Sequence, residues 1–390
     1  MTAIRRTAAA AALLLALPLS AVATAAPALA ATAPAASTAP VGVQVELPRP
    51  TGPFAVGRQI LHLTDRSRTD PWVPSAGPRQ LMVSMYYPAK AGTGGPAPYM
   101  TPEAARLMLD VKLPGNTIPT EVVTGTRTWS RTDALPQHGR FPLVVLSPGY
   151  TMPRTELTAL AEDLSSRGYV VALVDHTYEN TGTTFPDGHT TTCEACEFPP
   201  SDEQLATFAE SRPKDVSFVL DRLTDRGRPA WRYAHLIDRD RIGMAGHSLG
   251  GAAAVPALLT DDRIRAGANL DGTMFVPVPA TGLKGKPFLM IGRPLDGPDD
   301  PSWTESWSHL DGWKRWLTVA GSDHGSFTDI PLFFEKLGLP QSPETTVTAA
   351  RGIQLTRQYV AAFFDLQLKG VPQRILDGPT PVNPEIGFHP

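Results

Sequence analysis

Short apolar segments alternate with amphipathic segments along most of the chain. The segments at residues 141–150, 169–176 and 241–246 are almost entirely apolar, and each is short enough to form a single strand. Continuous apolar runs of this length are typical of strands that are buried on both faces of a sheet. Three further strands are predicted at residues 263–271, 286–293 and 314–321.

Between these segments, apolar residues recur at the spacing of a helix. One helix is predicted to begin at Thr155, as its N-cap, and to end at Gly168. Apolar residues at 216–223 mark a second helix, and a last one is predicted over 352–368 and ends before Gly370. Strands that alternate with helices predict an α/β protein, with a mostly parallel central sheet and helices on both of its faces.

Three segments do not follow this alternation of apolar strands and amphipathic helices. Residues 81–87 alternate between more and less apolar side chains, which predicts an early strand with one well-buried face. Residues 91–140 are rich in glycine, proline and threonine, which predicts a long connection over the surface. Residues 181–210 form an insertion that is either a lid or rim over a pocket or an ordinary surface excursion, and the sequence leaves both interpretations open.

The N-terminus has the layout of a secretory signal peptide. Residues 1–30 contain Arg5 and Arg6, then an apolar run, and then small residues suited to cleavage. The leucine-rich run is shorter than the ~20 residues that a membrane-spanning helix needs. Residues 31–45 are an Ala/Pro/Thr-rich linker, and we expect residues 46–390 to form a single catalytic domain. The mature protein is therefore expected to be secreted and extracellular.

Composition narrows the function classes. The 390 residues are 42% hydrophobic and 19% charged, which suits a large core and is too little charge for disorder. The formal net charge of −3 argues against nucleic acid as the partner, because phosphate binding needs clustered lysine and arginine. Two cysteines exclude a disulfide-dense scaffold and a four-cysteine zinc module.

The segment GHSLGG at 246–251 is the strongest chemical signal. It contains the pattern G-x-S-x-G, follows a predicted strand and precedes a run of small residues. A nucleophilic serine at such an elbow needs a strand, a turn too tight for side chains at the flanking positions, and then a helix. We therefore predict that Ser248 is a nucleophile.

A serine hydroxyl needs a base to take its proton, and an acid to orient that base. His324 follows the last predicted strand in a glycine-flanked loop, where the base belongs when the chain order is serine, acid, histidine. Asp271 and Asp296 both end predicted strands between the serine and the histidine, and spacing alone does not decide between them. Asp323 is adjacent to His324 and poorly placed to reach its Nδ1 atom.

The oxyanion donors are expected to be two backbone N–H groups. One belongs to Leu249, directly after the nucleophile, and the other to Tyr150, in the loop after the strand that begins at Phe141. This chemistry requires no metal and no cofactor.

These residues carry a family resemblance over about residues 79–365. The segments GHSLGG, ANLDGTMFVPV and GSDHGSFTDIPLF resemble the secreted α/β-hydrolases related to plasma-type (isoform II) platelet-activating factor acetylhydrolase. The resemblance implies the α/β-hydrolase fold, and it implies that the acid is the aspartate before Met-Phe, which is Asp271. The SPGYT segment at 147–151 is also similar to that of actinobacterial cutinase and polyester hydrolases, where the tyrosine supplies an oxyanion N–H and the acid lies at the position of Asp296.

Two further features are interpreted by position. Met274 and Phe275 are expected near the substrate because they follow Asp271, whereas the four tryptophans at 303–316 stay unassigned. Cys193 and Cys196 are expected to form a local disulfide, since one C-x-x-C supplies only half of a metal site.

The sequence thus predicts a serine ester hydrolase that works through an acyl-enzyme. The resemblance implies short-acyl or platelet-activating-factor-like phospholipid esters, and the alternatives are a cutinase, polyester hydrolase or lipase, then a serine peptidase or an acyltransferase. The expected partner is a small-molecule or lipid ester, with transient contact at a lipid interface left open and no obligate protein partner.

Overall fold

The computed structural model describes residues 42–196, 199–295 and 300–390. The expected leader and most of the linker lie outside these residues, as does Asp296. Among the described residues, we find no helix that is both long and apolar enough to cross a membrane.

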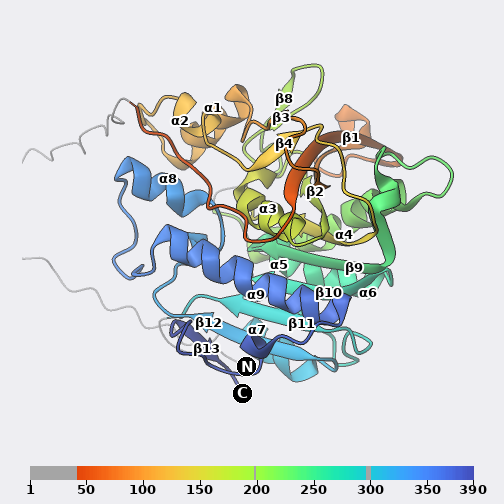
Figure 1. Cartoon of the computed structure of the whole chain (residues 1–390), viewed down its shortest axis with the longest axis vertical. Helices are drawn as coiled ribbons and strands as arrows, with labels where there is room; N and C mark the ends of the chain where they lie inside the picture. Colours follow the sequence, from red (N-terminus) through yellow and green to blue (C-terminus); the bar gives the residue numbers. More distant parts are fainter. Residues whose placement is uncertain (1–41, 197–198, 296–299) are drawn as a thin grey trace, which may run out of the picture. The chain divides into compact units, whose positions relative to one another are not determined.

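One mixed sheet organises the described chain (Figure 1). Its strands run in the order β13-β12-β11-β10-β9-β5-β6-β2-β1-β4-β3. The central strands are β5 (Phe141–Ser147), β6 (Val170–Asp175), β9 (Ile237–His247), β10 (Ile264–Leu270), β11 (Phe288–Gly292) and β12 (Lys314–Val319). The others are β1 (Ala55–Thr69), β2 (Pro78–Ala89), β3 (Gly95–Pro96), β4 (Ser130–Thr132) and β13 (Ile386–Phe388). The six central strands pair in parallel, whereas β2 pairs antiparallel with both β1 and β6.

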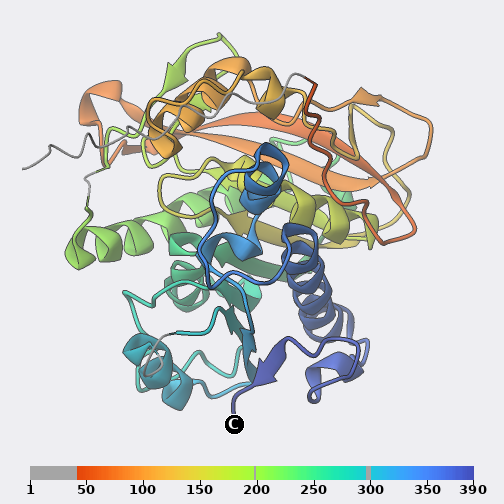
Figure 2. The ribbon, with the colours of Figure 1, turned by 90° about the vertical axis from the view of Figure 1, so that its left-hand side faces the viewer.

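Helices cover both faces of this sheet. The helices are α1 (Pro102–Lys112), α2 (Glu121–Thr124), α3 (Thr158–Ser166), α4 (Asp202–Thr224), α5 (Leu249–Ala252), α6 (Ala254–Thr260), α7 (Pro301–His309), α8 (Ile330–Leu337) and α9 (Ala349–Lys369). The long helices α4 and α9 lie on opposite sides of the sheet, as Figure 2 shows in green and dark blue. The predicted α/β class, with a mostly parallel sheet covered on both faces, is confirmed.

The two apolar layers of the core explain why the central strands are apolar throughout. One layer packs α4 and α6 against side chains such as Val145 and Met244, and the other packs α3 and α9 against side chains such as Val144 and Ala245. Successive residues of a strand point to opposite faces, so both sets must be apolar. The parallel register brings the carboxyl ends of β5, β9 and β10 to the same edge of the sheet.

Three local predictions were wrong. Thr155 is not an N-cap, because a 3-10 turn (Arg154–Leu157) precedes α3 and the side chain of Asp329 accepts from the backbone of Ala159. Residues 91–140 are not only a surface connection, because they include α1 and α2, whose apolar side chains pack against α8 and α9. The strand at 81–87 is buried on both faces, since α3 covers the side that carries Tyr86.

The insertion at 181–210 forms a short hairpin and the beginning of α4. Its strands are β7 (Thr183–Thr184) and β8 (Thr190–Thr191), and the structure joins Cys193 and Cys196 in a disulfide just after them. Residues 202–210 are the first turns of α4, which continues to Thr224.

Candidate active site

Ser248 lies at a sharp turn between β9 and α5. Its backbone angles are φ 53° and ψ −123°, a conformation that residues other than glycine rarely adopt. The turn is tight because a side chain at Gly250 would overlap the carbonyl group of Ser147, at the end of β5. The strained turn raises the half-buried serine at the carboxyl edge of the sheet, as the sequence predicts for an elbow.

The structure brings Ser248, His324 and Asp271 into one hydrogen-bonded row. His324 Nε2 is 2.9 Å from Ser248 Oγ, and His324 Nδ1 is 2.5 Å from Asp271 Oδ2. Asp271 follows β10 and is nearly buried, whereas the His324 side chain is 47% exposed. The serine therefore has a base within reach, and the base has a carboxylate on its other nitrogen.

Asp271 is held as a carboxylate. Its Oδ1 atom accepts from the backbone N–H of Arg293 at 2.8 Å, and its Oδ2 atom accepts from the Arg293 guanidinium at 2.6 Å. Burial alone would raise the pKa of Asp271, but the hydrogen bond and charge of His324, together with Arg293, outweigh it and lower the pKa. An ionised acceptor at Nδ1 favours the histidine tautomer whose Nε2 can accept the serine proton.

The two other acids considered from sequence differ from Asp271. Asp296 lies outside the described residues. Asp323 uses its carboxylate locally, because Oδ1 accepts from the hydroxyl of Ser326 and Oδ2 from that of Thr345. It therefore stabilises the turn that carries His324, and its described hydrogen bonds go to these hydroxyls and not to the imidazole.

His247, the residue before the nucleophile, connects three parts of the site. Its Nε2 atom donates to the backbone carbonyl of His324 at 2.7 Å, and its Nδ1 atom is 3.3 Å from Glu156 Oε1. The same Glu156 oxygen accepts from the backbone N–H of Gly149 at 2.5 Å. Burial alone would lower the pKa of His247, but the charge and hydrogen bond of Glu156 raise it. Sequence reasoning placed His247 as a support of the turn and did not find Glu156 or Arg293.

The loop after β5 lies against the nucleophile. A side chain at Gly149 would come within 3.4 Å of the Cβ atom of Ser248, so the backbone that leads to Tyr150 runs beside the serine. Leu249 begins α5 on the other side of Ser248. Of the two predicted oxyanion donors, Leu249 thus directly follows the nucleophile in the chain, and Tyr150 follows Gly149, whose backbone lies beside the nucleophile.

Apolar side chains surround these two residues. Tyr150 and Phe275 are partly buried and pack against a small cluster that contains Leu249 and Phe208. Ala195 and Leu205, from the insertion at 181–210, join the same cluster. Phe275 thus packs against the cluster that contains Leu249, the residue after Ser248.

Met274 points elsewhere. It is 1% exposed and packs in the core with Trp303, so in this structure it offers no accessible surface to a substrate. Trp303 and Trp316 line a hollow of about 250 Å³ next to Asp271, together with Arg293 and His389.

One group among the described residues has the chemistry of metal ligands. His176, Glu179 and Asp215 are buried, with ligand atoms within 4.8 Å of one another. Both carboxylates already contact guanidinium groups, those of Arg79 and Arg212, so their charge is balanced without a cation.

Comparisons with known proteins find similar proteins over most of the chain. Residues 40–204 and 231–369 match the family described as platelet-activating factor acetylhydrolase, isoform II. The chain is 30% identical to a probable 1-alkyl-2-acetylglycerophosphocholine esterase of Arthroderma benhamiae, over 88% of this chain and 93% of that protein. It is 29% identical to platelet-activating factor acetylhydrolase of Bos taurus, over 51% of this chain and 50% of that protein.

A solved structure is also similar over most of the chain. It is a ferulic acid esterase from Streptomyces cinnamoneus, with 44% identity and a TM-score of 0.79, over 88% of this chain and 99% of that one. The match supports the α/β-hydrolase fold that the resemblance implied.

Proposed function

Because the chain belongs to the platelet-activating factor acetylhydrolase, isoform II, family and is a carboxylic ester hydrolase, we propose that it cleaves esters through an acyl-enzyme on Ser248. The observation that carries this proposal is the hydrogen-bonded row of Ser248, His324 and Asp271. Its distances are those at which a base can take the hydroxyl proton and a carboxylate can hold the imidazole.

The first half-reaction forms the acyl-enzyme. Ser248 Oγ attacks the ester carbonyl carbon while its proton moves to His324 Nε2. Asp271 accepts from His324 Nδ1 and stabilises the imidazolium, and the backbone N–H groups of Tyr150 and Leu249 donate to the tetrahedral oxyanion. The intermediate then collapses, the carbon–oxygen bond to the alcohol breaks, and His324 returns the proton to the leaving alcohol.

The second half-reaction regenerates the enzyme. Water replaces the alcohol, His324 takes a proton from it, and the hydroxide equivalent attacks the acyl carbon. The same oxyanion donors serve the second tetrahedral intermediate. It collapses to the carboxylic acid as the bond to Ser248 Oγ breaks and His324 returns its proton to that oxygen.

For the substrate we propose short-acyl esters, including the 2-acetyl ester of platelet-activating-factor-like phospholipids. Support comes from the matching family and from the relative in Arthroderma benhamiae, whose name specifies a 2-acetyl glycerophospholipid. The partly buried side chains of Tyr150 and Phe275 supply apolar surface for such a substrate beside Leu249. We also propose that the protein is secreted after removal of residues 1–30.

Feruloyl esters are the second candidate substrate. They are favoured by one observation, the 44% identity to a ferulic acid esterase over 88% of the chain. The acyl groups differ in shape, because acetyl is small whereas feruloyl is a planar aromatic acyl group. Substrate profiling therefore separates the two candidates.

The test is a substrate panel for the protein from residue 31 onward. It contains p-nitrophenyl esters from acetate to palmitate, a 2-acetyl phospholipid, methyl ferulate and a polyester film. We expect turnover that is highest with acetyl esters and absent in Ser248→Ala. Methyl ferulate turned over faster than the acetyl phospholipid would favour the second candidate, and full activity in Ser248→Ala would refute the mechanism.

A further inference from the structure

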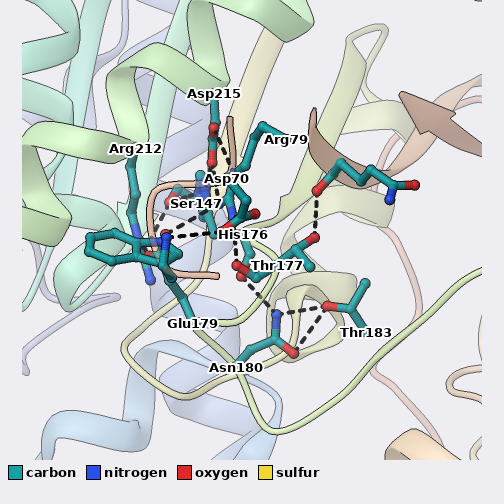
Figure 3. Close-up of polar contacts among 12 residues, drawn as sticks. Asp70, Arg79, Ser147, His176, Thr177, Glu179, Asn180, Thr183, Arg212 and Asp215 are labelled. Carbon is teal, nitrogen blue, oxygen red and sulfur yellow. Dashed lines mark hydrogen bonds and ion pairs between the residues drawn. The ribbon is translucent and has the colours of Figure 1, made fainter. Parts of the chain in front are cut away.

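A buried cluster of charged and polar side chains contacts the Ser147–Thr151 loop, and Figure 3 shows its members. Its members are Arg79, His176, Glu179, Arg212 and Asp215, and none of their side chains is more than 1% exposed. Burying charges costs free energy, even when they are paired. None of these side chains takes part in the proposed catalytic steps, so catalysis by them does not explain why their charges are buried here.

One branch of the cluster is a hydrogen-bonded chain that ends on Ser147. His176 Nδ1 is 2.9 Å from Asp215 Oδ2, and His176 Nε2 is 3.0 Å from Ser147 Oγ. Burial, followed by the charge of Arg212, lowers the pKa of His176, so the imidazole is neutral. The charge of Arg79 and the hydrogen bonds from His176 and Arg79 outweigh burial and lower the pKa of Asp215, so the carboxylate is ionised.

These charge states fix the protons of this branch. The ionised Asp215 accepts from Nδ1–H of His176, and Nε2 accepts the hydroxyl proton of Ser147. The arrangement resembles the row at Ser248, but Ser147 and Asp215 are fully buried and His176 is 1% exposed. No substrate can reach Ser147, so this chain of hydrogen bonds holds the residue in place.

The other branch acts on the loop through Arg212. Its Nη1 atom donates to the carbonyl of Pro148 at 2.5 Å, and its Nη2 atom donates to that of Gly149 at 3.5 Å. The guanidinium is itself held by Glu179 Oε2, which accepts from Nε at 2.9 Å. One rigid, fork-shaped group thus fixes two successive peptide units of the loop.

Because the peptide bond is planar, the contact of Arg212 with the Gly149 carbonyl also sets the direction of the Tyr150 N–H. The C=O and N–H groups of a trans peptide point in opposite directions. The Gly149 carbonyl faces Arg212, so the N–H of Tyr150, in the same peptide unit, points away from the cluster. The preceding unit is fixed from both sides, since Gly149 N–H donates to Glu156.

We propose that Arg212, supported by Glu179, and the Asp215–His176 pair are positioning residues that hold the Ser147–Thr151 loop, so that the N–H of Tyr150 is aimed at the oxyanion. The inference rests on the proposed function, because an oxyanion forms only if Ser248 attacks a carbonyl. Preorganised donors contribute most when they need no rearrangement during the reaction. A cluster whose charged side chains are buried and each held by several partners supplies such rigidity.

The test compares variants per active site, so that unfolded protein is not counted. Active sites are titrated with a phosphonate ester that labels the nucleophilic serine. The main variant is Arg212→Met combined with Glu179→Gln, which removes both charges of the pair together. We expect kcat per site for p-nitrophenyl acetate to fall by about 10- to 100-fold with KM nearly unchanged. Affinity for a trifluoromethyl ketone, whose hemiketal carries an oxyanion, should fall by a similar factor.

Two further variants make the result decisive. Arg68→Met is the matched control, because Arg68 also pairs with Asp215, at 2.8 Å, but has no contact with the loop among its described hydrogen bonds. It should retain wild-type kcat per site. Ser147→Ala breaks only the hydroxyl end of the other branch and should give a smaller loss of kcat, again with reduced ketone affinity.

The inference is overturned if the double variant keeps wild-type kcat per site and ketone affinity and only unfolds more readily. If the double variant yields no folded protein, Ser147→Ala decides, and unchanged ketone affinity there overturns the inference. Wild-type protein that is neither labelled by the phosphonate nor active on esters would refute the proposed function and this inference with it. Active wild type with unaffected variants refutes the inference alone.

Discussion

Arg293 binds Asp271 twice, through its backbone N–H to Oδ1 at 2.8 Å and through guanidinium Nη1 to Oδ2 at 2.6 Å. The same Nη1 atom is 3.1 Å from His324 Nδ1. A permanent cation therefore stands beside the imidazole that must become positively charged during the reaction. Its charge, together with the contacts from His324, lowers the pKa of Asp271 against the effect of burial and stabilises that carboxylate.

Replacing Arg293 should change the pH dependence of catalysis. In Arg293→Met, Asp271 loses the guanidinium charge that helps to lower its pKa, so its carboxylate should be protonated at higher pH than in the wild type. We therefore expect the loss of kcat/KM on acidification to begin at higher pH, by about 0.5 to 1 pH unit. Added salt should have less effect on the variant than on the wild type, because Arg293 is 37% exposed and its charge is screened. An acid limb at the wild-type position would show that Arg293 does not control the ionisation of Asp271.

His247 should stabilise the fold in a pH-dependent manner. Its folded-state pKa is raised, mainly by Glu156 against the effect of burial, so its charge contributes stability below the ordinary value of about 6.5 and loses it as pH rises through the folded-state pKa. We expect His247→Gln to lower the free energy of unfolding by about 1–3 kcal/mol below pH 6.5 and by less at alkaline pH. Urea unfolding at several pH values measures this.

A second histidine provides the control. His309 Nδ1 donates to a backbone carbonyl, that of Val278 at 2.8 Å, and none of its described hydrogen bonds joins it to a carboxylate. His309→Gln therefore measures the stability lost when a histidine hydrogen bond to a backbone carbonyl is removed without a carboxylate partner. Equal loss at acid and alkaline pH in His247→Gln would contradict a role for the charge of His247.

Gly149 should tolerate no side chain without loss of activity. A Cβ atom there would lie 3.1 Å from His247 Nδ1 and 3.4 Å from the Cβ atom of Ser248. We expect Gly149→Ala to push the loop away from the nucleophile and to lower kcat by about 10- to 100-fold, with a smaller effect on KM. Gly95→Ala, at a position where a Cβ atom would meet nothing within 4 Å, should leave kcat unchanged. Wild-type kcat in Gly149→Ala would mean that the loop is not an oxyanion donor.

The disulfide between Cys193 and Cys196 should matter little for stability. It closes a loop of only a few residues, for which chain-entropy arguments give about 2 kcal/mol at most. Its neighbour Ala195 packs in the apolar cluster with Tyr150 and donates its backbone N–H to the carbonyl of Tyr178. We expect the Cys193→Ser, Cys196→Ser variant to lower the thermal midpoint by a few degrees and to keep kcat on p-nitrophenyl acetate. A collapse of kcat would indicate that this segment shapes the site.

The central strands could be predicted from the sequence, because strands that are buried on both faces are recognisable as continuous apolar runs. The same reasoning predicted Ser248 directly after one such strand and His324 a few residues after another. It was weaker at the sheet's other end, where β1 mixes polar and apolar residues, and in 91–140, where α1 and α2 are short and bury their apolar residues against α8 and α9. There the contacts that stabilise each element come from distant parts of the chain.

The residues that support the site could not be predicted from local sequence either, because their partners lie far away along the chain. Glu156 and His247 are 91 positions apart, and Arg293 and Asp271 are 22 apart, so no spacing rule connects them. Spacing also left Asp271 and Asp296 as equal candidates for the acid. The structure brings Asp271 to the base, while Asp296 lies outside the described residues.

The proposed mechanism depends most on the identity of the acid, which is Asp271 as the partner of His324. The direct test is kcat/KM on p-nitrophenyl acetate for wild type, Asp271→Asn and Asp296→Asn, normalised to sites titrated with the phosphonate. We predict a fall of about 10⁴-fold in Asp271→Asn, in which the amide favours the wrong histidine tautomer, and nearly wild-type values in Asp296→Asn. An inactive Asp296→Asn variant together with an active Asp271→Asn variant would contradict the assignment of Asp271 as the acid.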